Sequence, residues 1–108
     1  MIKNEGEEIA QKFLFSKGYE ILERNFHAGQ LGEIDIVCRD GDEIVFVEVK
    51  MRSSDGFGDP EDAVDFRKLA KIARVAEVYL GGARSKWRID VVGIKGKEIV
   101  HIQDVSSD

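Results

Sequence analysis

Two neighbouring segments of this 108-residue chain carry carboxylates that could act together on a metal ion. Side chains two apart in a β-strand share a face, so Glu33 and Asp35 are paired on GEIDIVCR. Glu48 and Lys50 are paired in the same way on EIVFVEVK. In a hairpin turning at Asp40-Gly41, Glu33 lies opposite Glu48, whereas a four-residue turn places Asp35 opposite Glu48. Either register gathers three carboxylates with Lys50 at their edge.

The surroundings of these carboxylates favour a cation. The run 44–47 (IVFV), directly before Glu48, is apolar at every position, which is typical of a central strand buried on both faces. Buried carboxylates are costly unless they are paired, protonated or bound to a cation, and Lys50 can balance only one of them. Oxygen ligands favour Mg²⁺, with Mn²⁺ as a substitute. The alternative is that Glu48 and Lys50 form an ordinary exposed ion pair.

The elements that must position this cluster follow from hydrophobic spacing. We expect helices over 4–17 and 60–80, the second starting at Pro60 and stopping at Gly81-Gly82. Runs of β-branched and aromatic residues predict strands over 19–26, 32–39, 43–50, 87–94 and 98–105, with a mobile loop over 51–59. This order predicts an α/β/α sandwich with a mixed central sheet.

Length and composition limit the class of protein. A chain with 43% hydrophobic and 34% charged side chains suits one domain, which we expect to span 1–108. The longest uncharged apolar run is too short to cross a membrane, and the acidic N-terminus does not resemble a secretory signal. Cys38 has no partner for an internal disulfide, so we expect a cytoplasmic protein.

The net charge of -5 is unevenly distributed. Between positions 64 and 88, seven basic residues stand against two acidic ones, a local charge of +5 that leaves -10 elsewhere. Arg67, Lys71 and Arg74 follow helical spacing and Lys68 lies beside them, so this helix face could contact DNA phosphates. The alternative is a solvated helix face that binds nothing.

Motifs along most of the chain resemble a known family. They are Gly6-Glu7 with Ala10, Gly32-Glu33-Ile34-Asp35, the run 45–50 (VFVEVK) with Arg52, Lys68, and Arg88-Ile89-Asp90-Val91-Val92. Asp35 followed by Glu48-Val49-Lys50 resembles the active-site signature of the PD-(D/E)xK nucleases, and the whole set resembles the YraN family of small endonuclease-like proteins. The resemblance implies a restriction-endonuclease-like fold, similar to Holliday junction resolvases, and a Mg²⁺-dependent endonuclease that hydrolyses DNA.

The resemblance also implies roles for the residues. Asp35, Glu48 and the backbone carbonyl of Val49 would hold the ion, and Lys50 would orient or deprotonate the attacking water. Glu33 would be an outer carboxylate or a ligand to a second ion.

The predicted DNA-binding set combines the helix face found from spacing with one strand residue, Arg52, from the family motifs. Its members are Arg52, Arg67, Lys68, Lys71 and Arg74. A symmetric branched substrate would need two active sites, so such a target implies a homodimer.

Glu7 is the candidate catalytic residue of the first helix. On a helical wheel Glu7 lies about 90° from the centre of the apolar stripe and Glu8 about 170°. Glu7 is therefore better placed to reach the acidic end of the sheet. The alternative is a capping pair of Asn4 with Glu7.

Two other function classes are consistent with the sequence. One is a nucleic-acid-binding protein that keeps the nuclease fold without its chemistry. The other is a metal-dependent hydrolase of a small phosphate ester, although the sequence has no recognisable pocket motif for such a substrate.

Overall fold

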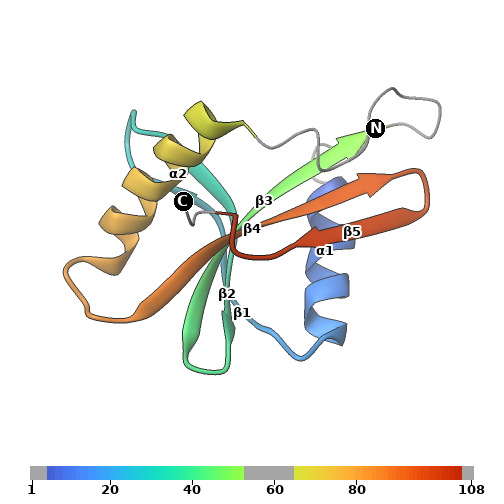
Figure 1. Ribbon diagram of the computed structural model, residues 1–108, viewed down its shortest axis with the longest axis horizontal. Coiled ribbons are helices and arrows are strands. Elements are labelled where there is room, and N and C mark those ends of the chain that lie inside the picture. Colours follow the sequence, from blue (N-terminus) through green and yellow to red (C-terminus); the bar gives the residue numbers. More distant parts are fainter. Residues whose placement is uncertain (1–4, 53–64, 106–108) are drawn as a thin grey trace.

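A twisted five-stranded sheet with one helix on each face forms the framework of the chain (Figure 1). The computed structural model describes residues 5–52 and 65–105. The elements, in chain order, are α1 (Glu5–Ser16), β1 (Glu20–His27), β2 (Glu33–Asp40), β3 (Glu43–Arg52), α2 (Phe66–Leu80), β4 (Lys86–Lys95) and β5 (Glu98–Ile102). The spatial order follows the chain, and all pairs are antiparallel except β3 with β4. The predicted α/β sandwich is confirmed, and it is consistent with a restriction-endonuclease-like fold.

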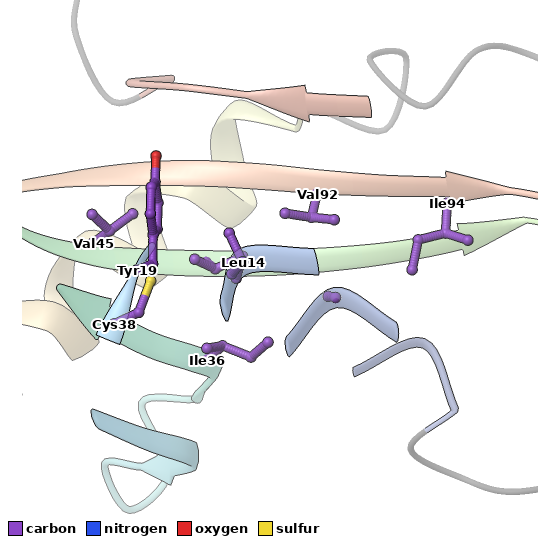
Figure 2. Packing of buried hydrophobic residues seen from close by; sticks show 9 residues of the cluster. Leu14, Tyr19, Ile36, Cys38, Val45, Val92 and Ile94 are labelled. Atoms are coloured by element: carbon purple, nitrogen blue, oxygen red, sulfur yellow. The ribbon is translucent and has the colours of Figure 1, made fainter. Parts of the chain in front are cut away.

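The helix α1 covers one face of the sheet. Ala10 and Leu14, one turn apart, pack on β-branched side chains of the three central strands, as Figure 2 shows for Leu14 beside Ile36 and Val92. Cys38 belongs to this buried cluster, and burial raises the pKa of its thiol to about 12. It therefore acts as a small neutral core residue.

The helix α2 covers the other face and is shorter than the sequence predicts. Asp65 is extended, and its side chain accepts a hydrogen bond from the Arg67 N–H at 2.9 Å, so the helix begins at Phe66. The predicted start at Pro60 is wrong for this reason, and positions 60–64 lie outside the described residues. Gly81 ends the helix as predicted, with a left-handed backbone at φ 57°.

The hairpin of β2 and β3 has the register expected for the four-residue turn, which places Asp35 opposite Glu48, but a two-residue turn one position later than Asp40-Gly41 produces this register. Asp40 pairs with Glu43, which leaves Gly41 and Asp42 as the turn. Gly41 has a φ of 64°, which glycine adopts without strain, whereas a type I′ turn at Asp40-Gly41 would also require a positive φ at Asp40. The strand β3 also continues to Arg52, so the loop expected from position 51 starts later, and the rest of it lies outside the described residues.

The last strand, β5, ends earlier than predicted. It stops at Ile102, and Asp104 has a left-handed φ of 56° while its N–H donates to Asp90 Oδ1 at 3.0 Å. Asp90 is fully buried and also contacts Arg88 at 2.9 Å and His101 at 2.7 Å. Arg88 is therefore a core residue, and its charge does not belong to the exposed basic surface. No helix of the described residues is long and apolar enough to cross a membrane.

Candidate active site

Asp35 lies where β2 and β3 separate. The pairing of the two strands ends at Ile36↔Val47, so the next residues, Asp35 and Glu48, are outside the ladder. Beyond this last pair, the Val49 N–H has no backbone carbonyl of β2 as its acceptor. It donates instead to Asp35 Oδ2 at 2.8 Å. Both candidate acidic residues therefore lie at an opening between two central strands.

The alternation of faces along β2 breaks at the same position. Ile34 packs on the α2 side and Ile36 on the α1 side, although they are two residues apart. Asn25 of β1 lies opposite Asp35 and has a left-handed backbone at φ 54°. The sequence predicts Glu33, Asp35 and Glu48 on one face, but this irregularity divides them between two clusters.

The first cluster is a carboxylate trio of Glu7, Glu33 and Asp35. One oxygen from each residue lies within 4.8 Å of the other two. Asn25 stabilises the arrangement, since its Nδ2 donates to Glu7 Oε1 and to Glu33 Oε2, each at 3.0 Å. Glu8 has a side chain that is 55% exposed and points away, whereas Glu7 is 16% exposed, in agreement with the helical wheel.

Negative charge accumulates on the trio. Burial and the charge of Glu48 raise the pKa of Asp35 to about 7, with smaller contributions from Glu7 and Glu33, although the Val49 N–H opposes the shift. Asp35 is thus partly protonated near neutral pH in the absence of a cation. A divalent ion beside these oxygens would remove that repulsion.

The second cluster is a lysine pair around Glu48. Glu48 Oε2 lies 2.5 Å from Lys68 Nζ and 3.5 Å from Lys50 Nζ. The nearby Lys68 ammonium and partial burial lower the pKa of Lys50. Burial opposes the charge of Lys68, but its contacts with Glu48 and Lys50 and the charges of Glu48 and Asp35 together outweigh burial and raise the Lys68 pKa. Lys50 is therefore the easier of the two lysines to deprotonate.

Comparison with known proteins relates this site to a family. The family described as "Uncharacterised protein family UPF0102" matches residues 6–94, which include both clusters. The chain belongs to this family. The chain is similar to the UPF0102 protein of Thermodesulfovibrio yellowstonii, with 44% identity over 93% of this chain and 90% of the relative. The UPF0102 proteins of Acetivibrio thermocellus (47% identity, 94% and 82%) and Thermotoga petrophila (45%, 94% and 93%) are similar too. The resemblance to the YraN family is confirmed, and the family description states no activity.

The remaining predicted DNA-binding residues of this UPF0102 protein lie around the two clusters. Arg67, Lys71 and Arg74 are exposed on α2, further around the helix than Lys68. Arg52 is the last residue of β3 and lies two positions beyond Lys50.

Two residues of β1 in the site are missed by the sequence reasoning. Arg24 contacts Glu8 at 2.6 Å and Glu7 at 3.4 Å, and Asn25 joins Glu7 to Glu33. Neither belongs to a recognisable motif of the family resemblance. The only sequence signal is a run of three polar residues, 23–25, within an otherwise partly apolar strand, which is too common to identify a site.

Proposed function

We propose that this UPF0102 protein is a Mg²⁺-dependent endonuclease that hydrolyses DNA phosphodiester bonds, with branched or structured DNA as its target. The observation that carries the proposal is the position of Asp35. Asp35 belongs to the carboxylate trio. Its pKa is also raised by the charge of Glu48, whose carboxylate contacts the lysine pair. Metal ligands and a lysine of lowered pKa are thereby adjacent, as hydrolysis by an activated water requires.

The donor set fits a hard divalent cation. The trio offers only carboxylate oxygens, the ligands that Mg²⁺ prefers, and burial together with the charge of Glu48 raises the pKa of Asp35 to about 7, a cost that a bound cation would offset. The N–H and C=O of one strand residue point to the same side, so the Val49 carbonyl faces the opening into which its N–H donates. Asp35, Glu48 and the Val49 carbonyl would hold the ion. Glu7 and Glu33 would complete the coordination or hold a second ion.

The residues of the lysine pair supply the proton chemistry. Bound Mg²⁺ would polarise the scissile phosphate and stabilise negative charge in the transition state. Lys50, with its lowered pKa, accepts the proton of the attacking water, and the ammonium form neutralises charge on the phosphate. Lys68 keeps the charge of Glu48 balanced and lies where it can also contact the phosphate.

The experiment that tests this function measures cleavage of a panel of nucleic acids. Single-stranded, duplex, flap and four-way-junction DNA, together with RNA, are incubated with protein in Mg²⁺, in Mn²⁺ or in chelator. We expect cleavage of at least one DNA substrate that chelator abolishes. Binding to DNA without cleavage of any substrate would contradict the proposal and favour a non-catalytic binding protein.

A further inference from the structure

A small hollow lies beside the carboxylate trio, between α2 and the loop 28–32. Its volume is about 140 Å³. The lining is apolar at Leu31, Ile72 and Val75 and charged at Glu33 and at two lysines, Lys68 and Lys71. Glu33 belongs to the trio and Lys68 to the lysine pair, so the hollow is continuous with both clusters.

The lining matches the chemistry of a nucleobase attached to a phosphate backbone. Apolar walls suit the flat faces of a base, and ammonium groups beside them suit the flanking phosphates. The carboxylate of Glu33 can accept a hydrogen bond from an exocyclic amino group at the base edge. Leu31 is 45% exposed on the loop, so its side chain can contact a ligand without rearrangement of the core.

A base that remains in a duplex cannot occupy this hollow. Paired bases are stacked on both faces, and a base must leave the stack to enter a pocket on a protein. We propose that the hollow receives one unpaired nucleobase of the DNA strand, next to the scissile phosphate, which a divalent cation on the carboxylate trio would hold. This inference rests on the proposed function and specifies its substrate: DNA with an unpaired nucleotide beside the cut.

Three DNA probes of otherwise identical sequence test the proposal. The first is a fully paired duplex, the second carries one unpaired nucleotide, and the third carries an abasic residue at that unpaired position. Affinities are measured by fluorescence anisotropy with Ca²⁺ in place of Mg²⁺, and cleavage is measured separately with Mg²⁺. We expect the probe with the unpaired base to bind about tenfold more tightly than the abasic probe, because a stacked base contributes that much.

Two variants give a matched comparison. Leu31→Ser should abolish the preference for the unpaired base. Val78→Ser should retain it, because Val78 is similarly exposed (49%) but does not line the hollow. Equal binding of the second and third probes, or a preference unchanged in Leu31→Ser, would overturn the inference.

The same experiment separates this inference from the proposed function. Cleavage without any preference for the unpaired base overturns the subsite and leaves the nuclease. Preferential binding that depends on Leu31, without cleavage of these probes or of any substrate in the panel, supports the subsite and contradicts the nuclease. Failure to bind any of the three probes overturns the subsite, and the nuclease is then judged by cleavage of the wider substrate panel.

Discussion

Lys68 Nζ lies 2.5 Å from Glu48 Oε2, closer than Lys50 Nζ at 3.5 Å from the same oxygen. The helix α2 thus contributes the principal ion-pair partner of a carboxylate on β3. Because Lys68 forms this ion pair, Lys50 is not the only described cation that compensates the negative charge of Glu48. The nearby second ammonium also lowers the pKa of Lys50, which favours the proposed role of this lysine as a base.

Replacement of Lys68 by alanine should therefore change the acidity of Lys50. Without the neighbouring ammonium, and with Glu48 left to pair with Lys50, the pKa of Lys50 should rise. NMR titration of the Lys50 side-chain Cε resonance measures this directly, and turnover near neutral pH should fall about tenfold or more. An unchanged Lys50 titration would show that Lys68 has no influence on the proposed base.

Asn25 should matter for metal affinity through the two carboxylates that its amide joins. Asn25→Gly and Asn25→Ala both remove the amide, so calorimetric titration should show Mg²⁺ binding weakened by about 10- to 100-fold in both. The two variants should differ in stability. Glycine adopts the φ of 54° freely, whereas alanine there costs about 1 kcal/mol in urea unfolding. Wild-type Mg²⁺ affinity in both variants would contradict this role.

The ionisation of Asp35 should make stability depend on pH in the presence of chelator. Its folded-state pKa of about 7 exceeds the ordinary value of 3.8, so the folded chain binds this proton more tightly than the unfolded chain. The cost of the charge is therefore absent below about pH 4, grows as pH rises, and is complete above pH 7.

Asp35→Asn removes that cost while keeping an oxygen for the Val49 N–H. Urea unfolding should show the variant more stable than wild type at pH 8, by on the order of 2 to 4 kcal/mol, and little changed at pH 4. Asp42→Asn, in the exposed hairpin turn, is the control and should show no such difference. The same gain for Asp35→Asn at both pH values would exclude the raised pKa as its cause.

The basic surface of α2 should contribute DNA affinity that depends on salt. The double variant Arg67→Ala with Lys71→Ala should reduce the slope of log affinity against log salt by roughly two, because each phosphate contact contributes about one. Lys86→Ala, at the hairpin end of the sheet and 75% exposed, is the control. An unchanged slope in the double variant would require a different docking surface.

Much of the fold could be predicted because hydrophobic periodicity reports which face of an element is buried. The α1 stripe with Ala10 and Leu14 and the apolar runs of the central strands are found as expected. The errors are at element ends, where single contacts decide. The cap by Asp65, the positive φ of Gly41 and the hydrogen bond from Asp104 to Asp90 have weak sequence signals.

The site was less predictable than the fold. Spacing correctly brings Glu33 and Asp35 together and places Glu48 opposite Asp35, but the strand rule also predicts all three carboxylates on one face, whereas Glu48 belongs to the lysine pair. The left-handed backbone of Asn25 breaks that rule, and it is stabilised by side-chain contacts with Glu7 and Glu33 from distant positions. A tertiary arrangement of this kind leaves no local pattern in the sequence.

The role of Lys50 provides the most direct measurement of whether this protein is an enzyme. Single-turnover cleavage and equilibrium binding are measured on the best DNA substrate for wild type, Lys50→Ala and Lys86→Ala. We expect Lys50→Ala to lower the cleavage rate by about 100-fold or more with little change in affinity, because the proposal assigns this lysine to the attacking water and to the transition-state charge. Lys86→Ala should cleave like wild type. Wild-type cleavage by Lys50→Ala would contradict the catalytic assignment.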